Sequence, residues 1–227
     1  MMTSSETSLT TIEDFRRRAK ELLSSEGWSF YNDASGRRST FRDSMAAFDR
    51  YVIRPRILRD ITQRSLSTTV LGQPISMPIC VAPTAAQQFA HPDAEAASAK
   101  GEAAMEAADA GVSGIIVSAH GGRHMDGVPA PIDVLAEVVS AVKGRGVEVY
   151  MDGGVRSGTD ALKALGLGAR AVLIGRPALW GLACDGPAGV TKVLSILRFE
   201  LDTALGISGC TSIQDIPPSL IARKSYL

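Results

Sequence analysis

Short apolar runs alternate with amphipathic stretches along most of this chain. The runs at residues 79–81, 114–117, 147–151 and 171–174 are rich in Val and Ile and end in polar or glycine residues, as buried parallel strands do. The stretches at 93–110, 132–143, 159–167 and 189–205 are predicted helices, because their composition or apolar spacing suits a helix. This alternation predicts an α/β protein built from βα units.

The residues before the first run follow other patterns. Thr10 and Glu13 predict a capping box for a helix that ends near Gly27. A loop at 29–40 comes next, and Ser39 is a candidate cap for a second helix. Residues 51–60 suit an extended surface segment, and 68–77 suit a hairpin that turns at 72–74.

These patterns divide one domain, residues 1–227, into four parts: a leader (1–77), a first βα unit (78–110), the last three βα units (111–206) and a C-terminal tail with a loose end (207–227). A βα unit takes roughly 30 residues and a closed eight-unit barrel about 250. Only about 150 residues follow the leader, so a complete eight-stranded barrel does not fit this chain.

Charge and cysteine content exclude several classes of protein. Lys plus Arg (24) equals Asp plus Glu (24), so no net field favours nucleic acid or an acidic membrane as a partner. No apolar stretch approaches the roughly 18 residues of a membrane span. The 3 cysteines are not in CxxC spacing, which argues against a zinc site or a disulfide framework. We expect an intracellular protein without a bound metal.

Glycine and polar residues follow the apolar runs where each predicted strand ends. Gly153 and Gly154 follow one run and Gly175 follows the next, so backbone N–H groups there can approach an anion closely. Arg156 and Arg176 can add charge-assisted contacts. The alternative is that the glycines only make tight turns and the arginines face solvent. Paired glycine loops after consecutive late strands favour the phosphate site of a βα-barrel.

The loop after the run at 114–117 carries the candidate catalytic groups. His120 can act as a base near neutral pH, and Arg123 can bind a carboxylate through two hydrogen bonds. The pair suits removal of a proton next to a carboxylate. The alternative is a loop histidine bonded to backbone. His124 and His91 are assigned to surface or loop, and Asp126 is expected to orient either the loop or His120.

Three stretches resemble a known family. Residues 118–124, Ser-Ala-His-Gly-Gly-Arg-His, are similar to a signature Ser-Asn-His-Gly-Gly-Arg-Gln. Residues 152–183 resemble the last two strands of a barrel, and the leader is similar at 41–61 and 71–95. Together they resemble the FMN-dependent 2-hydroxyacid oxidases, the family of glycolate oxidase and its long-chain relatives. The resemblance implies a TIM (β/α)8-barrel fold and FMN as the cofactor.

By position, the resemblance implies that His120 is the active-site base and that Arg123 binds the substrate carboxylate. Phe30 stands where the family has a substrate-binding tyrosine, and its ring cannot donate that hydrogen bond. Ala119 and His124 replace the Asn and Gln of the signature, which changes the hydrogen bonds of the loop. The implied FMN contacts are Pro83, Thr84, Ala85, Ser118, Asp152, Gly153, Gly154, Val155, Arg156, Gly175 and Arg176.

The resemblance also implies a missing segment. The family pattern has four more βα units between the runs at 79–81 and 114–117, and here residues 98–111 join the flanking helices directly. The missing part carries a flavin-contacting Gln and Thr, a Tyr and an Asp of the substrate pocket, and a Lys that steadies reduced flavin. We therefore expect barrel strands 1 and 6–8 only. Their open edges would need a homo-oligomer or another partner to cover them.

The function implied by the resemblance is FMN-dependent oxidation of an (S)-2-hydroxy acid to the 2-oxo acid. One alternative is a catalytically silent form that retains the FMN-phosphate half-site, and another is a different phosphate-binding barrel enzyme. Relatives often lie in peroxisomes, addressed by a C-terminal tripeptide similar to SKL. The chain ends Ser225-Tyr226-Leu227, which lacks the basic middle residue of that tripeptide. The resemblance nevertheless implies the peroxisome, with the cytoplasm as the alternative.

Overall fold

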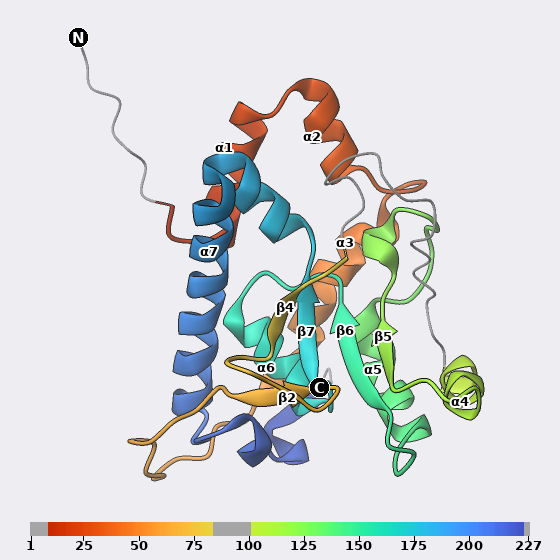
Figure 1. Ribbon diagram of the computed structural model, residues 1–227, viewed down its shortest axis with the longest axis vertical. Helices are drawn as coiled ribbons and strands as arrows, with labels where there is room; N and C mark the ends of the chain where they lie inside the picture. Colours follow the sequence, from red (N-terminus) through yellow and green to blue (C-terminus); the bar gives the residue numbers. More distant parts are fainter. Residues whose placement is uncertain (1–8, 84–100, 225–227) are drawn as a thin grey trace.

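The centre of the protein is a parallel sheet of four strands, seen in a computed structural model that describes residues 9–83 and 101–224 (Figure 1). In chain order the strands are β4 (Ile79–Val81), β5 (Gly114–Val117), β6 (Glu148–Asp152) and β7 (Ala171–Ile174). Their order across the sheet is β4-β7-β6-β5, and each neighbouring pair is parallel. The four predicted strands are all present, and their carboxyl ends lie at one edge of the sheet.

The strand that comes first along the chain, β4, pairs with the strand that comes last, β7, with Ile79 opposite Val172. Consecutive βα units would normally place β4 beside β5 instead. First-to-last pairing is how a (β/α)8 barrel closes, so the sheet is one continuous arc of such a barrel. Among the described residues, β4 and β5 form the two outer edges of that arc. The predicted fold, an incomplete βα-barrel, is confirmed.

Three helices cover one face of the sheet: α5 (Pro131–Ala141), α6 (Gly158–Gly166) and α7 (Arg176–Ile207) (Figure 1). A fourth helix, α4 (Gly101–Asp109), stands to the side of the sheet and packs against α5. Strand side chains on that face are almost fully buried, among them Val117, Met151, Val172 and Ile174. Burying a side chain of this size stabilises the fold by roughly 1.5–3 kcal/mol. The apolar side chains of these strands and the helices over them therefore form the core.

The predicted helices agree with these elements, with two differences. The stretch predicted at 189–205 is the second part of α7, which starts at Arg176 and bends at Asp185 and Gly186. Of the stretch predicted at 93–110, α4 covers Gly101–Asp109. Residues 93–100 lie outside the described residues.

The leader begins with α1 (Ile12–Leu22), which packs against α7. Its capping box is formed by Thr11 and Asp14, so the predicted pair of Thr10 and Glu13 is wrong by one residue. The Asp14 carboxylate accepts from the Thr11 N–H at 2.9 Å, and Glu13 instead pairs with Arg16. The predicted apolar positions Ile12, Phe15 and Ala19 are nevertheless buried, in the helix that packs against α7.

Gly27 does not end the first helix, contrary to the prediction. Leu23 is extended, and the Ser24 hydroxyl then caps a second helix, α2 (Ser25–Asn32), by accepting from the Gly27 N–H. Part of the predicted loop at 29–40 is therefore helical. The third helix, α3 (Ser39–Ala46), has Arg38 at its N-cap and no side-chain cap of its own, so the predicted cap at Ser39 is wrong by one residue. The helix runs into a 3₁₀ turn, η1 (Ala47–Arg50).

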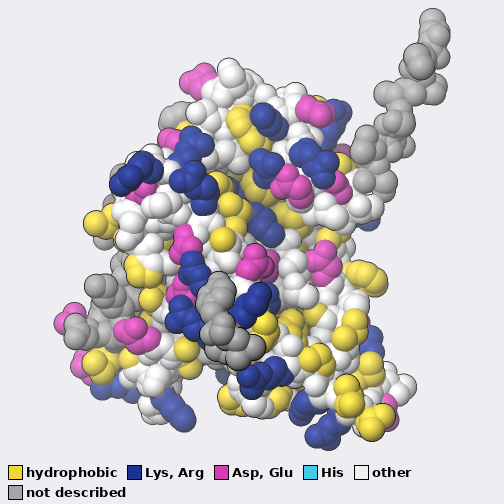
Figure 2. Space-filling view, turned by 180° about the vertical axis from the view of Figure 1, so that it is seen from behind, with side chains coloured by type: hydrophobic (Ala, Val, Ile, Leu, Met, Phe, Trp, Pro, Cys, Tyr) yellow, Lys and Arg dark blue, Asp and Glu magenta, His cyan; other side chains and the backbone are white. Residues whose placement is uncertain are grey.

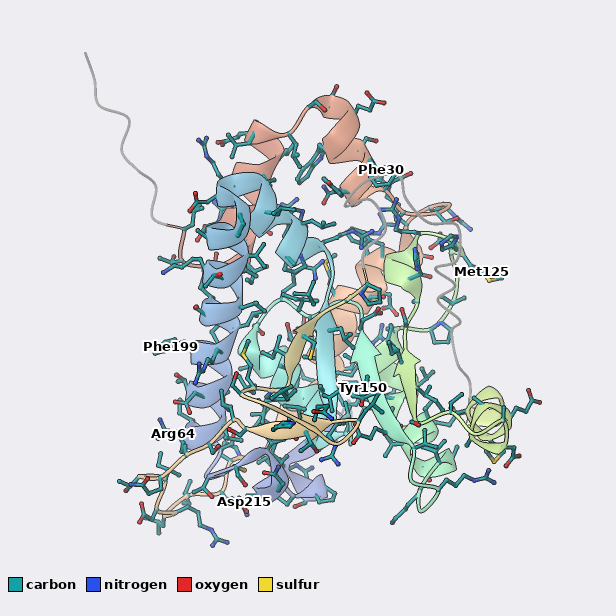
Figure 3. The ribbon with its side chains drawn as sticks, viewed as in Figure 1. Phe30, Arg64, Met125, Tyr150, Phe199 and Asp215 are labelled. Carbon is teal, nitrogen blue, oxygen red and sulfur yellow. The ribbon has the colours of Figure 1, made fainter. Side chains whose placement is uncertain are left out.

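The tail is not a loose end within the described residues. Strand β1 (Tyr51–Ile53) pairs antiparallel with β8 (Ile221–Arg223), after the short turns η3 (Ile213–Asp215) and η4 (Pro218–Leu220). Arg56 donates to the Asp215 carboxylate at 2.9 Å, which ties the leader to the tail. Figure 3 labels Asp215 at the end of the molecule opposite Phe30. The terminal residues 225–227 lie outside the described residues.

The predicted hairpin is present as β2 (Thr68–Val70) and β3 (Gln73–Ile75). Its turn lies at Leu71 and Gly72, which both have positive φ. The turn is therefore one residue before the predicted position. The Leu71 N–H donates to the Glu148 carboxylate at the start of β6. The hairpin thus crosses the amino-terminal end of the sheet, as Figure 1 shows, and leaves the carboxyl ends accessible.

The outer surface carries charges of both signs. Figure 2, taken from behind, shows basic and acidic side chains intermixed, with smaller apolar areas between them. No described helix has the length and apolar character needed to cross a bilayer.

Candidate functional site

A cavity of about 300 Å³ lies at the carboxyl ends of the strands. Most of the predicted site residues line it: Phe30, Pro83, His120, Arg123, Asp152, Gly153, Gly154, Val155, Arg156, Gly175 and Arg176. Ser118 is buried next to it and contacts His120 and Asp152. Thr84 and Ala85 lie outside the described residues. Positions far apart in the sequence therefore meet in one place.

Two glycine loops form one wall of the cavity. Gly153 and Gly154 follow β6 with φ of 88° and 81°, a conformation that residues with a Cβ rarely adopt. Gly175 follows β7 and is the N-cap of α7, so the positive end of a long helix faces the same cavity. The N–H groups of Gly154, Val155 and Gly175 donate to no acceptor among the described residues. Such donors suit a phosphate.

Arg156 supplies one of the two cations beside these loops. Its guanidinium stacks over the Trp180 ring at 5.1 Å and donates to the Val155 carbonyl at 2.8 Å. Asp160 holds the turn by accepting from the Arg156 N–H at 2.9 Å. Burial lowers the pKa of Arg156 to about 10, which still leaves it charged at neutral pH.

Arg176 is the second cation, and most of its N–H donors are already used. It donates to the carbonyls of Tyr31 and Gly121 at 3.0 and 3.1 Å, and to that of Asp33 at 2.8 Å. Its guanidinium also lies 4.5 Å from the centre of the Phe41 ring. Burial lowers its pKa to about 10. Arg176 therefore fastens the leader to the loop after β5 and contributes positive charge to the cavity, without presenting a free fork of donors.

Asp152 has a buried oxygen without a partner. Its Oδ1 has no hydrogen-bond partner among the described residues, although the residue lines the cavity. Burial raises the pKa of Asp152, against the effect of a hydrogen bond from the Ser118 hydroxyl. A buried carboxylate oxygen of this kind needs a donor, such as the hydroxyl of a bound ligand.

His120 lies on the loop that follows β5, in the 3₁₀ turn η2 (His120–Gly122). The backbone N–H of His120 donates to the Ser118 hydroxyl at 3.0 Å. The backbone φ of His120 is 47°, which turns the chain sharply after the strand. Burial lowers the pKa of His120, and the positive charges of His124, Arg123 and Arg176 lower it further. The imidazole is therefore neutral at physiological pH and able to accept a proton.

Arg123 and Phe30 are in direct contact at the wall of the cavity. The Arg123 Nη1 donates to the Phe30 carbonyl at 2.8 Å, and its guanidinium lies 4.9 Å from the centre of the Phe30 ring. One of the five N–H donors of Arg123 is used in this way. The remaining donors can bind a carboxylate while the aromatic ring holds the guanidinium plane.

Among the lining residues that the sequence did not assign to the site, two carry polar side chains, Tyr31 and His124. His124, assigned to the surface, is exposed but also lines the cavity, with its ring centre 4.2 Å from that of His120. Tyr31 lines it beside Phe30. Both neighbour a predicted residue along the chain, which was the available signal. His91 lies outside the described residues.

Asp126 orients the loop and not His120, which settles the two options. Its carboxylate accepts from the Thr40 N–H at 2.8 Å, the Ser39 hydroxyl at 2.7 Å and the Arg37 N–H at 2.9 Å. These hydrogen bonds lower the pKa of Asp126 to about 2. An acidic side chain from the loop after β5 thus caps the amino terminus of α3.

Comparisons with known proteins identify the family. The family described as FMN-dependent dehydrogenase matches residues 19–106 and 99–223. The chain belongs to this family.

Alignments with individual relatives run from near the start to near the end of both chains. The chain is 31% identical to 2-hydroxyacid oxidase 2 of Mus musculus, an alignment that covers 94% of this chain and 98% of the relative. It is 29% identical to 2-hydroxyacid oxidase 1 of Homo sapiens, with 95% and 97% covered. Among solved structures, mandelate oxidase with (S)-2-phenylpropionate has a TM-score of 0.87 at 26% identity, covering 96% of this chain and 99% of that one.

Compared with the other FMN-dependent dehydrogenases, this chain lacks an internal segment. The alignment with the mouse protein runs over 348 positions, whereas the chain has 227 residues, so about a third of the aligned length has no counterpart. The two matched segments of the family meet between residues 99 and 106. The absence therefore falls between β4 and β5, inside the stretch 98–111 where the resemblance predicted it.

FMN is the cofactor of this family, and the residues present fit its phosphate end. The free N–H donors of the two glycine loops, the start of α7 and the charge of Arg156 and Arg176 match a phosphate. The unpaired oxygen of Asp152 matches a hydroxyl on the same ligand.

Proposed function

We propose that this chain oxidises an (S)-2-hydroxy acid to the 2-oxo acid with FMN as the electron acceptor. The observation that supports this most is the position of His120 and Arg123. A neutral base and a carboxylate-binding group lie on one loop, in the same cavity as the phosphate-binding glycines. Relatives at 29–31% identity are named 2-hydroxyacid oxidases, and the similar solved structures are mandelate oxidase.

In this proposal each group of the chain has one role. Arg123 pairs with the substrate carboxylate and so places the hydroxyl-bearing carbon near His120. His120 accepts one proton from the substrate, and its low pKa keeps it neutral beforehand. FMN, when bound, would take up the two electrons together with the second hydrogen of the substrate, so that the 2-oxo acid, protonated His120 and reduced flavin account for every atom and electron. The Phe30 ring stacks near the Arg123 guanidinium and keeps it in place for the substrate carboxylate.

The test is an absorbance spectrum of the purified chain with FMN, followed by anaerobic addition of glycolate or a longer 2-hydroxy acid. Bound flavin should show a perturbed spectrum, and the substrate should bleach it as the 2-oxo acid forms. If flavin binds and no substrate bleaches it, the catalytic role is wrong while the phosphate site stands. If flavin does not bind, both fail.

A second candidate is a catalytically silent form that keeps the FMN-phosphate half-site. The observation that favours it is the missing internal segment, because the cavity wall on that side is absent from this chain. It predicts binding of FMN without turnover of any 2-hydroxy acid. Membership of the family leaves the sugar- or nucleotide-phosphate enzyme without support.

Replacing Phe30 with tyrosine is expected to lower KM for the 2-hydroxy acid roughly tenfold. Phe30 lines the cavity, 40% exposed, next to Arg123, and a hydroxyl there would add a hydrogen bond to the substrate carboxylate. A hydrogen bond to a charged group contributes about 1.5 kcal/mol. Steady-state kinetics would measure the change.

The matched control for this variant is Phe199→Tyr, which adds the same hydroxyl on the exposed side of α7 (Figure 3). It should leave KM unchanged. Equal KM values for Phe30→Tyr and the wild type would show that Phe30 does not lie beside the substrate carboxylate.

We further propose a peroxisomal location and a small-molecule substrate. Two Arabidopsis thaliana relatives, each 29% identical, are named peroxisomal (S)-2-hydroxyacid oxidases. Imaging of the tagged chain together with a peroxisomal marker tests the location, and a diffuse signal would favour the cytoplasm.

A further inference from the structure

The sheet has two open edges, one along β4 and one along β5. No other described strand pairs with either edge. Edge strands carry unpaired backbone N–H and C=O groups, and proteins normally cover or pair them. The edge side chains Val81 and Ile116 are large, apolar and 39% and 38% exposed. These edges need a partner of complementary geometry.

The existing hydrogen bonds determine which backbone groups are available. Val172 donates to the Pro78 carbonyl and Ala82 donates to the Ile174 carbonyl. Successive residues of a strand direct their N–H and C=O to opposite sides, so those of Val81 point away from β7. On β5, the Ser113 carbonyl accepts from Glu148. By the same alternation, the N–H and C=O of Ile116 point away from β6.

We propose that two copies of this chain close one eight-stranded barrel, with β4 of each copy pairing in parallel with β5 of the other. A twofold axis along the barrel keeps all strands parallel and joins unlike edges, so two copies use up every edge. Eight parallel strands is the number at which this architecture closes. A twofold axis across the strands would pair like edges antiparallel and leave the sheet open.

The register supports this closure. Within one copy, Ile79 pairs with Val172, Val172 pairs with Met151, and Met151 pairs with Val117, so Ile79 and Val117 lie at the same height in the sheet. A barrel of this type has a shear of about 8 residues, so each equal half contributes a shift of about four.

Only one direction of that shift keeps the two strands in contact, and it places Val81 opposite Ile115 of the second copy. The Val81 N–H then meets the Gly114 carbonyl, and the Ile116 N–H meets the Val81 carbonyl. These are the groups that point to the open edges, so the shift and the alternation agree.

The closed barrel would also complete the wall of the functional site. All strand ends of both copies would lie on one rim, so the second copy would stand where the missing βα units leave the cavity open. This inference rests on the sheet and not on the proposed oxidation. A failure of one therefore leaves the other intact.

The first test is the mass of the purified chain in solution, by light scattering across a range of concentrations. Twice the chain mass of 23.9 kDa is expected for the wild type. Ile116→Pro removes the edge N–H without removing a bond to β6 and should give a single-chain mass. Ile116→Thr keeps the N–H and the branched shape and should remain a dimer. Far-UV circular dichroism confirms that both variants are folded.

The second test distinguishes this dimer from any other. In a variant with Cys80, Cys184 and Cys210 replaced by serine, Ala82→Cys and Ile116→Cys are introduced together. Within one chain these positions lie on opposite edges with two strands between them, roughly 14 Å apart and beyond disulfide reach.

In the closed barrel the two new cysteines face each other across the β4–β5 contact. Mild oxidation should give a covalent dimer on a non-reducing gel, and neither single variant should form it as efficiently. A single-chain mass at every concentration, or a dimer that survives Ile116→Pro and does not cross-link, would overturn the proposal.

Discussion

Replacing His120 with alanine is expected to lower kcat by about 10²–10⁴-fold, the usual contribution of a positioned general base. FMN affinity should stay close to that of the wild type, because the two glycine loops and Arg156 are untouched. Stopped-flow reduction of the flavin measures the first quantity, and quenching of flavin fluorescence measures the second. A loss of FMN binding equal to the loss of activity would show that His120 acts on the cofactor site.

The matched control is His124→Ala, which removes an imidazole whose ring centre lies 4.2 Å away. It should leave kcat at pH 8 within a few-fold of the wild type. If both variants lose activity equally, the two histidines act as a pair and the assignment of His120 alone is wrong.

The pH dependence follows from the same residue. Burial and then the positive neighbours lower the pKa of His120 below its usual 6.5, so the acid limb of kcat/KM should lie below that value. Removing His124 removes a positive neighbour, raises the pKa of His120 and moves the limb to higher pH. The lowered pKa of His120 also makes folding stability depend on pH. As pH falls below 6.5, the unfolded chain takes up a proton on this histidine before the folded chain does, so the free energy of unfolding declines.

The sequence predicted the site better than it predicted the leader. Each strand and the loop after it are local features, and parallel strands bring their carboxyl ends to one edge. Residues such as Gly153 and Gly175 could therefore be assigned to one cavity without a structure. The register of a cap is less well determined, because Thr10 and Thr11 both offer a hydroxyl and Glu13 and Asp14 both offer a carboxylate.

Contacts between distant segments could not be predicted. Tyr51 pairs with Arg223 from the other end of the chain, and no pattern within either segment signals this. Arg176 was interpreted as a phosphate cation, but its donors bind three backbone carbonyls, two of them in the leader. A backbone carbonyl is present at every residue, so the choice of these three depends only on the folded chain.

Replacing Gly154 with alanine is expected to be among the most destabilising single changes in this protein. A Cβ at this position would lie 1.8 Å from the Ser44 carbonyl oxygen and 2.8 Å from the Phe48 ring. The positive φ alone costs about 1–2 kcal/mol for a residue with a Cβ. The overlap adds about 1–3 kcal/mol, because a backbone atom cannot rotate out of the way.

Gly144 offers a control that separates these two effects, because its φ is also 81° and nothing lies within 4 Å of its added Cβ. Gly144→Ala should show only the conformational cost, so the difference in unfolding free energy between the two variants, measured by urea denaturation, reports the close approach itself. Equal unfolding free energies would mean that α3 does not pack closely against the loop that contains Gly153 and Gly154. A larger loss for Gly154→Ala, with weaker FMN binding, would show that the leader forms the floor beneath that loop, and this would explain why a chain that lacks the middle of its barrel still retains its leader.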